Sequence, residues 1–206
     1  MQVYFLETGP LQNNVYIIEV KDKAIIIDCG MDFDKVNDFL AKKGLTPVAV
    51  LLTHSHFDHS FVAKEFQNMG AKVYIGSIDG EKIKKGDILS KDFGIPSKAF
   101  TPDFLLNDGD KIEIEGVTFE VLLTPGHTDG SVCYLTGDTL FSGDTLFSLS
   151  IGRTDFPTGN YVDMINSLKR LSKLDQNLKV YPGHGEKTTL GFEVKNNPYM
   201  KWYDKD

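Results

Sequence analysis

The order of hydrophobic and polar positions predicts short strands interleaved with helices in both halves of the chain. Apolar runs bounded by turn residues predict strands at 3–6, 15–20, 24–27, 48–52, 73–75, 111–114, 117–123, 131–135, 139–141 and 179–181. Apolar residues at helical spacing predict helices over 34–43, 60–69, 78–85 and 161–174. This mixture is typical of a layered α/β sandwich and not of a single βαβ array.

Local patterns add detail to this expectation. Lys21 and Asp22 form a turn that predicts a hairpin between 15–20 and 24–27. The run 48–52 is continuously apolar, which is typical of a strand covered on both faces. Between 76 and 107 the pattern is weak apart from the short helix, and we expect a lid or an irregular insertion there. No repeat, low-complexity tract or linker divides the sequence, so we expect one domain over 1–206.

Composition argues against several classes of protein. Hydrophobic residues make up 41% of the 206 positions and charged residues 25%, as in an ordinary globular protein. The formal net charge of −7 makes the chain a poor electrostatic partner for nucleic acid or an anionic membrane. We find no apolar run long enough to span a bilayer and no secretory signal pattern at the N-terminus. Two cysteines are too few for a disulfide framework, so we expect a cytoplasmic protein.

The strongest chemical signal is the segment THSHFDH at 53–59, directly after the predicted strand 48–52. It places three imidazoles and a carboxylate close together, as the candidate ligands His54, His56, Asp58 and His59. Imidazole and carboxylate suit zinc, iron or manganese rather than calcium. A purely structural cluster would bring three histidines together, where protonation causes mutual repulsion. The segment therefore predicts a metal site, with Asp58 and His59 in the first turn of a following helix.

Three further segments each present a candidate ligand after a glycine. They are TPGH ending at His127, SGD ending at Asp144 and PGH ending at His184. A glycine lets the backbone bend tightly and approach a metal closely. A single histidine beside glycine is usually an ordinary loop residue. Together with the cluster at 53–59, however, these segments account for every histidine in the chain.

The motifs THSHFDH, TPGHT, SGDT and PGHG, in this order, resemble those of the metallo-β-lactamase fold superfamily. The resemblance covers nearly the whole chain. It implies a four-layer αββα sandwich with a dinuclear metal site at the edges of its sheets. It also implies which residues would hold two divalent ions: His54, His56 and His127 the first, Asp58, His59 and His184 the second, and Asp144 both as a bridge.

Zinc is the expected metal, although iron and manganese accept the same ligands. Asp28 matches the early structural aspartate of the superfamily and is expected to organise a loop or orient a ligand. Cys29 and Cys133 are expected to be packed thiols, because neither has a base beside it in sequence.

Within the superfamily, the chain resembles the short bacterial glyoxalase II-like hydrolases, formally hydroxyacylglutathione hydrolases. This resemblance rests on the segments 140–147, 151–159 and 183–191 and on Glu193, Asn197 and Pro198. It implies hydrolysis of a small thioester by a metal-bridging hydroxide that Asp58 orients. A thiolate, with a pKa of about 8.5, leaves without a general acid, which suits a site with no sixth histidine.

Arg153 lies shortly after the bridging Asp144. We expect it to pair with Asp155, because both residues lie in one tight turn, and binding of a substrate carboxylate is the alternative role. The segment after His184 is shorter than the C-terminal extension of full-length glyoxalase II enzymes. Thioester hydrolysis is therefore a safer expectation than glutathione specificity.

Other functions of the same fold stay open. Persulfide dioxygenases resemble the chain at 126–130 and 152–156, and they use one iron held by the equivalents of His54, His127 and Asp144. Their final histidine is typically followed by an Asp-Tyr pattern, which this chain lacks, so hydrolysis is favoured. Nucleases of this fold are disfavoured because they need a basic track, which this acidic chain lacks. Flavin-linked diiron reductases are disfavoured because they usually have Glu at the position of His56. True β-lactamases are usually exported, and we find no export signal. A metal-binding or redox-sensing module is the non-enzymatic alternative, and the thioester and the oligomeric state stay open.

Overall fold

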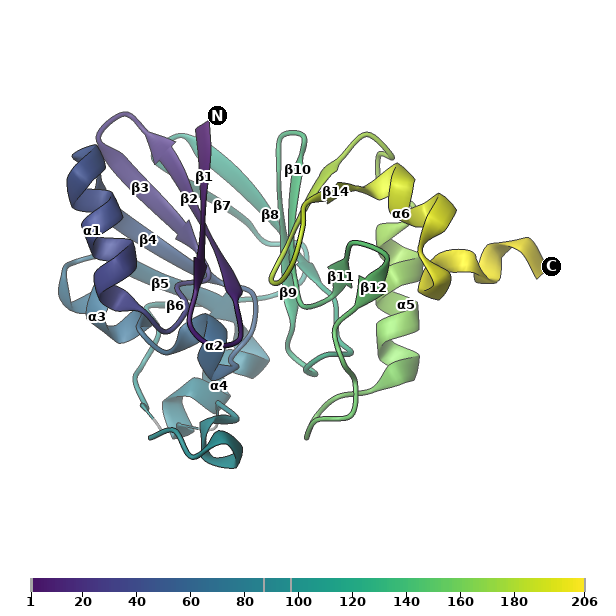
Figure 1. Ribbon diagram of the computed structural model, residues 1–206, viewed down its shortest axis with the longest axis horizontal. Coiled ribbons are helices and arrows are strands. Elements are labelled where there is room, and N and C mark those ends of the chain that lie inside the picture. The colour runs from purple at the N-terminus through teal and green to yellow at the C-terminus, as the bar shows by residue number, and fades with distance from the viewer. Residues whose placement is uncertain (1, 87, 97, 206) are drawn as a thin grey trace. The chain divides into compact units, whose positions relative to one another are not determined.

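The computed structural model describes residues 2–86, 88–96 and 98–205 and divides the chain into two units (Figure 1). The first unit comprises Met1–Leu106 and Glu113–Val117, and the second comprises Asn107–Ile112 and Thr118–Asp206. Each contains helices and most of one six-stranded sheet. The expected single domain over 1–206 stays a prediction. No described helix is long and apolar enough to cross a membrane.

The sheet of the first unit begins antiparallel and continues parallel. Its strands follow one another in sequence order: β1 (Gln2–Thr8), β2 (Asn13–Val20), β3 (Lys23–Ile27), β4 (Thr46–Leu52), β5 (Lys72–Gly76) and β6 (Phe104–Leu106). The predicted hairpin is confirmed, because β2 and β3 pair antiparallel across Lys21, whose φ is +57°. From β3 to β6 the strands are parallel, since helices return the chain to the same edge each time.

The helices of the first unit lie in these returns. They are α1 (Phe33–Lys43), α2 (Phe57–Ser60), α3 (Ala63–Asn68), α4 (Ser77–Lys85) and the 3₁₀ helix η1 (Ser90–Phe93). α1 begins where the side chain of Asp32 accepts a hydrogen bond from Lys35 N, and it ends at Gly44 in the left-handed conformation. The helix predicted over 60–69 was wrong in its extent. It divides into α2 and α3 because Val62, with φ −104° and ψ 13°, leaves the helical conformation.

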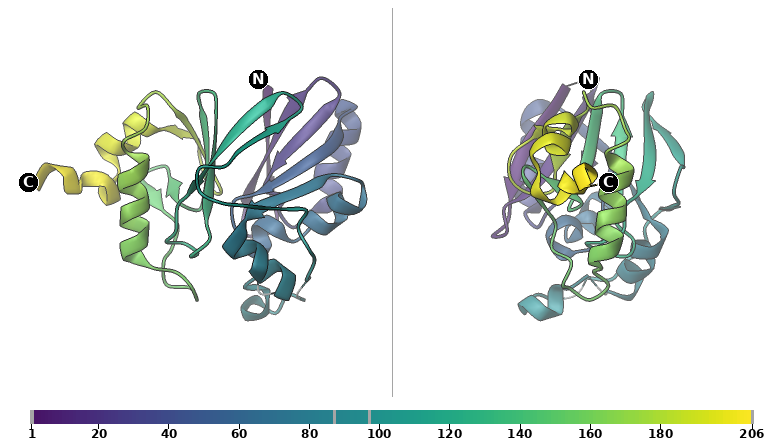
Figure 2. Two further views of the ribbon diagram at one scale, coloured as in Figure 1. Left: turned by 180° about the vertical axis from the view of Figure 1, so that it is seen from behind. Right: turned by 90° about the vertical axis from the view of Figure 1, so that its right-hand side faces the viewer.

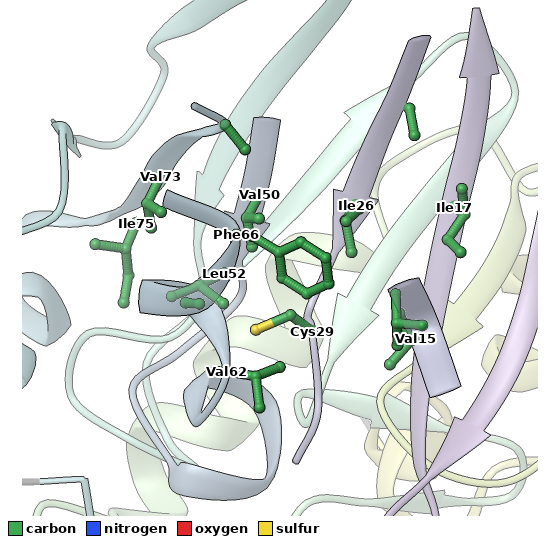
Figure 3. Close-up of a cluster of buried hydrophobic side chains, with 14 of the residues drawn as sticks. Val15, Ile17, Ile26, Cys29, Val50, Leu52, Val62, Phe66, Val73 and Ile75 are labelled. Carbon is green, nitrogen blue, oxygen red and sulfur yellow. The ribbon is translucent and has the colours of Figure 1, made fainter. Parts of the chain in front are cut away.

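The core of the first unit lies between one face of its sheet and the helices α1 and α3. Alternate strand residues point to this face, including Val15 and Ile17 of β2 and Val50 and Leu52 of β4 (Figure 3). Phe66 of α3 packs among them. The residues of β4 that point to the opposite face, Ala49 and Leu51, are also buried. The prediction that 48–52 is covered on both faces is therefore confirmed.

The second unit contributes a mainly antiparallel sheet. Its order is β14 (Thr188–Thr189), β13 (Lys179–Pro182), β10 (Thr139–Gly143), β9 (Val132–Thr136), β8 (Val117–Leu123) and β7 (Lys111–Ile114). β10 and β13 are parallel, because α5 (Tyr161–Leu171) connects them. α5 packs on this sheet through Met164, Leu168 and Leu171 (Figure 2). It begins where the side chain of Asn160 accepts hydrogen bonds from Val162 N and Asp163 N.

All ten predicted strands are present, with bounds that differ by at most two residues. Elements that the pattern did not predict are short: β6, β11 (Leu146–Phe147), β12 (Ser150–Ile151), β14, α6 (Leu190–Asn196), η1 and η2 (Pro198–Lys205). The strands among them and η1 have only two to four residues, too few for a periodicity to be detected, whereas α6 and η2 have seven and eight residues and were missed. The weak stretch from 76 to 107 contains α4, as predicted for 78–85, together with η1 and β6.

Candidate metal centre

The cluster at 53–59 lies at the carboxyl end of β4, which is flanked by β3 and β5 in the sheet. The strand ends at Leu52, and α2 begins at Phe57 with His56 in the capping position. Asp58 lies in the first turn of α2, as predicted. This turn breaks the alternation of the strand, so His54 and His56 need not point to opposite faces of the sheet.

The ligand side chains of this loop gather into one group. The ring centroids of His54 and His56 are 4.7 Å apart, and those of His54 and His59 are 4.2 Å apart. Nε2 of His59 lies 3.5 Å from Oδ2 of Asp58. Except for the partly exposed edges of His56 and Asp58, the group is closed to solvent. The first unit thus brings together all four candidate ligands that the sequence places in it.

Asp28 organises this loop from the end of β3. Its Oδ1 accepts a hydrogen bond from Thr53 N at 2.8 Å, and its Oδ2 accepts one from Thr53 Oγ1 at 2.9 Å. Oδ2 also lies 2.9 Å from Nδ1 of His59. Asp28 adopts φ +51°, a left-handed conformation that aspartate tolerates better than most residues. The expectation that Asp28 organises the loop and orients a ligand is consistent with these contacts.

These contacts indicate which ring nitrogen carries the proton in His59 and in His54. A carboxylate can only accept, so His59 donates from Nδ1 to Asp28, and its Nε2 is the atom that would face a metal. The hydroxyl of Thr53 donates its single proton to Asp28 and can only accept from other groups. Nδ1 of His54, which lies 3.0 Å from Thr53 Oγ1, is therefore the donor in that contact. The Nε2 atom of His54 would then also be the one to face a metal. Metal-binding histidines are commonly oriented in this way.

In the second unit, His127 follows β8 in a turn that only glycine can form. Gly126 has φ +144°, and a Cβ there would clash with the backbone of Met164 in α5. Nδ1 of His127 lies 2.8 Å from the carbonyl oxygen of Arg153. Because a carbonyl only accepts, His127 donates from Nδ1, and Nε2 is again the atom that would face a metal.

The glycines before the other two ligands differ from each other. Gly143, before Asp144, has φ +48°, as a tight bend requires. Gly183, before His184, is not among the residues with positive φ. The expectation of a glycine-dependent bend therefore holds for Gly126 and Gly143, whereas the turn before His184 does not need one.

Asp144 lies between the two histidines of the second unit. Its Oδ2 is 3.4 Å from Nε2 of His127 and 3.6 Å from Nε2 of His184. Two atoms that bind one metal at 2.0–2.2 Å in tetrahedral geometry lie about 3.3–3.6 Å apart. Both separations, and the 3.5 Å between His59 and Asp58, fit that spacing. One oxygen of Asp144 is thus placed to share a metal with each histidine.

The segment that follows Asp144 is fixed by a buried polar network. Glu193 of α6 accepts hydrogen bonds from Leu149 N and Thr188 Oγ1 at 2.8 and 2.7 Å. Asn197 donates to the carbonyl of Ser150 at 3.0 Å and to Glu193 at 2.9 Å. Glu193 and Asn197 therefore hold the β11–β12 turn, and this gives a structural reason for two residues that the sequence resemblance singled out.

Arg153 forms the expected pair with Asp155, through two hydrogen bonds of 2.7 and 2.8 Å. This contact raises the pKa of Arg153 and lowers the pKa of Asp155. The guanidinium carbon also lies 3.8 Å from the ring centroid of Phe156. The backbone of Arg153 orients His127, a role that sequence reasoning missed. Substrate binding by its side chain stays a prediction.

Cys29 and Cys133 are both buried free thiols, as expected. Burial raises the pKa of Cys29 well above its usual range and raises that of Cys133 to about 11. Neither sulfur is a thiolate at neutral pH, which argues against nucleophilic catalysis by cysteine.

Several residues that support the ligands carried no signal in the sequence. Ser60 Oγ shares its single proton between the carbonyls of Ser55 and His56. Asp79 of α4 accepts a hydrogen bond from Ser55 N at 2.8 Å. The contacts of Ser60 are local, whereas Asp79 and Ser55 lie 24 positions apart and only the folded chain brings them together.

Comparison with known proteins identifies the family. The sequence model of the metallo-β-lactamase superfamily matches residues 8–184. The chain is 33% identical to the "Probable metallo-hydrolase YqgX" of Bacillus subtilis, over 96% of this chain and 97% of that one. It is also 33% identical to the "Hydroxyacylglutathione hydrolase GloC" of Haemophilus influenzae, over 97% of this chain and 98% of that one.

Solved structures give the same result. The BLEG-1 B3 metallo-β-lactamase matches with a TM-score of 0.90 and 34% identity, over 97% of this chain and all of that one. A di-iron-bound form of TTHA1623 matches at 0.85 and 35%, over 95% and 99%. ETHE1 from Myxococcus xanthus matches at 0.78 and 32%, over 96% and 84%. The predicted fold of two β-sheets flanked by helices is confirmed. The chain belongs to the metallo-β-lactamase superfamily.

Proposed function

We propose that the seven candidate ligands form one dinuclear centre, and that this centre hydrolyses a small thioester of the hydroxyacylglutathione type. The observation that carries the proposal is the position of Asp144 Oδ2, which lies at metal-sharing distance from both His127 and His184. A carboxylate between two histidines in this way is suited to bridge two ions. The proposal is further supported by the 33% identity to GloC of Haemophilus influenzae over nearly the whole chain.

The donor chemistry of the site fits divalent metal ions. Five neutral imidazoles and two carboxylates are the ligands that zinc, iron and manganese prefer. In the proposed centre the first ion would be held by His54, His56 and His127, the second by Asp58, His59 and His184, and Asp144 would serve both. Zinc is the proposed metal, and the di-iron form of TTHA1623 makes iron the first alternative to test.

The protein residues of the centre have separate tasks in this proposal. When bound, two divalent ions lower the pKa of a shared water toward about 7 and polarise the scissile carbonyl. Asp58 accepts a hydrogen bond from that water and directs it at the acyl carbon. Asp28, Thr53 and the Arg153 carbonyl keep protons off the Nε2 atoms of the ligand histidines that they contact.

The preference for a thioester follows from the lack of a histidine that could protonate the leaving group. Every histidine of the chain is a proposed ligand, so none is available as a general acid for the leaving group. A thiolate, with a pKa of about 8.5, leaves without protonation, whereas an amine requires it. We therefore propose a small thioester as the partner, and not nucleic acid or a membrane surface.

The test combines metal content with activity. We expect about two metal ions per chain by elemental analysis, together with hydrolysis of S-lactoylglutathione. Removal of the metal with a chelator should abolish hydrolysis, and addition of zinc should restore it. A metal-loaded protein that leaves both S-lactoylglutathione and simpler thioesters intact would contradict the proposed reaction.

A mononuclear iron persulfide dioxygenase is the second candidate. The observation that favours it is that His127 and Asp144 by themselves lie at the distance of two ligands on one ion. With His54 they would form a two-histidine, one-carboxylate iron site with open positions for oxygen. One iron per chain, with oxygen uptake on addition of glutathione persulfide, would establish this activity in place of the hydrolase.

A further inference from the structure

Asp79 is a buried carboxylate that neither the proposed ligand set nor the proposed reaction uses. It lies in the first turn of α4 and is 0% exposed, although its helix carries mostly polar residues. Its Oδ2 accepts a hydrogen bond from Ser55 N at 2.8 Å. Its Oδ1 accepts one from Lys82 Nζ at 2.7 Å, and only 16% of the Lys82 side chain is exposed. The carboxylate is thus engaged on both oxygens in the interior of the first unit.

Ser55 is the residue between the proposed ligands His54 and His56. The orientation of its peptide groups determines where the two flanking imidazoles point. On the carbonyl side, Ser60 Oγ donates to Ser55 O at 2.8 Å and to His56 O at 3.0 Å. On the amide side, Asp79 holds the N–H. The two peptide groups that flank Ser55 are therefore each held by a side chain outside the proposed ligand set.

The helix that carries Asp79 is seated tightly on the sheet. A Cβ added at Gly80 would clash with Leu105 of β6 and contact Ile75 of β5 closely. The absence of a side chain at Gly80 lets α4 pack closely against the sheet. The backbone of the adjacent Asp79 is therefore held at a fixed distance from the sheet. A rigid acceptor is what a positioning residue requires, because a mobile one would not restrict the loop.

A buried ion pair is a poor source of stability. Removing a carboxylate and an ammonium group from water is unfavourable, and well-packed apolar residues often serve the fold equally well. The arrangement is better explained by the need to hold one particular backbone amide in place. Asp79 supplies a strong, charge-assisted acceptor for one particular amide, and Lys82 compensates the charge that this acceptor introduces.

We propose that Asp79, with Lys82 as its counter-ion, is a positioning residue that preorganises the His54-Ser55-His56 segment for metal binding. The inference rests on the proposed metal centre but not on the thioester as substrate. It assigns Asp79 no contact with a metal or with substrate. Without this acceptor the Ser55 peptide can rotate, and binding a metal must then also order the loop. Supporting residues around metal ligands commonly contribute about 10- to 100-fold in affinity.

The experiment measures metal binding in the full chain with Zn²⁺, by competition with a chromophoric chelator, and with Co²⁺, by its visible absorption. We expect Asp79→Ala to weaken Zn²⁺ binding about 10- to 100-fold and to alter the Co²⁺ spectrum. Asp79→Asn should recover part of the affinity, because the amide oxygen can still accept from Ser55 N. The double variant Asp79→Ala/Lys82→Met removes both charges and tests the same point if an unpaired Lys82 prevents folding.

Asp103 provides a matched control. Its carboxylate also accepts hydrogen bonds from a backbone N–H, that of Val73 at 3.0 Å, and from a lysine, Lys72, at 2.9 Å. Among the described residues, its hydrogen bonds do not reach the segment 53–59. Asp103→Ala should lower the stability of the apoprotein in urea without changing metal affinity or the Co²⁺ spectrum.

Two outcomes would overturn the inference. Unchanged Zn²⁺ affinity and Co²⁺ spectrum in folded Asp79 variants would show that Asp79 serves the fold alone. An equal loss of affinity in Asp103→Ala would show that any loss of stability in this unit has the same effect. A wild-type chain that binds metal yet hydrolyses no thioester would contradict the proposed reaction and leave this inference intact, whereas a chain that binds no metal would overturn both.

Discussion

Replacing Asp28 by asparagine tests the claim that hydrogen bonds set the protonation of the ligand histidines. Asparagine has the same shape and tolerates the φ of +51° at this position, so the backbone should not change. Asp28 accepts three hydrogen bonds, two from Thr53 and one from His59. An amide retains one oxygen and presents an NH₂ group in place of the other. That group would face donors at the position of Oδ2.

The magnitude follows from these contacts. If the amide oxygen stays with Thr53 N, the NH₂ group faces His59 Nδ1–H. His59 must then move its proton to Nε2, the proposed ligand atom, or leave a buried donor without an acceptor. A hydrogen bond to a charged group contributes about 1.5–3 kcal/mol. At about 1.4 kcal/mol per tenfold, metal affinity should fall roughly 10- to 150-fold.

The assay is competition for Zn²⁺ against a chromophoric chelator, with urea denaturation of the apoprotein measured in parallel. Asp108→Asn is the matched control, because Asp108 also accepts from a backbone amide, Leu123 N, and from a cation, Arg170. It contacts no proposed ligand, so its Zn²⁺ affinity should equal that of the wild type. Wild-type Zn²⁺ affinity in a folded Asp28→Asn protein would refute the reasoning about ring protonation.

Three further predictions concern other parts of the site. Asp58→Ala should lower turnover by orders of magnitude while the protein stays folded, and unaltered thioesterase activity would remove its proposed role. Arg153→Lys should cause a small shift of the urea midpoint and leave KM unchanged, because Arg153 pairs with Asp155 in solvent. A large rise in KM at unchanged stability would instead show that the Arg153 side chain binds substrate. The folded-state pKa of Cys133, about 11, exceeds its ordinary value of 9.0, so the unfolded chain deprotonates first and stability should fall as pH rises from about 9 to 11. Denaturation of Cys133→Ala across this range should show a smaller decrease, and an equal decrease would contradict the assignment.

The sequence alone determined the elements with strong local patterns and the identity of the candidate ligands. Strands such as β4 and helices such as α1 are encoded by periodicity and end signals within a few residues, which do not depend on the rest of the chain. The seven candidate ligands fall in motifs short enough to be recognised without a structure. The fold followed from the same motifs and is confirmed by the superfamily match.

Only the tertiary structure decided how the ligands are oriented. Asp79 reaches Ser55 across 24 positions of sequence, and Asp28 reaches His59 across 31. The acceptor for His127 is the backbone carbonyl of Arg153. Every residue has a backbone carbonyl, so the sequence gives no sign of this contact. The physical reason is that a hydrogen bond depends on where two distant segments cross, whereas periodicity depends only on neighbours. The sequence therefore indicated the candidate ligands of a metal site, and the fold decided which ring nitrogen carries the proton in His54, His59 and His127.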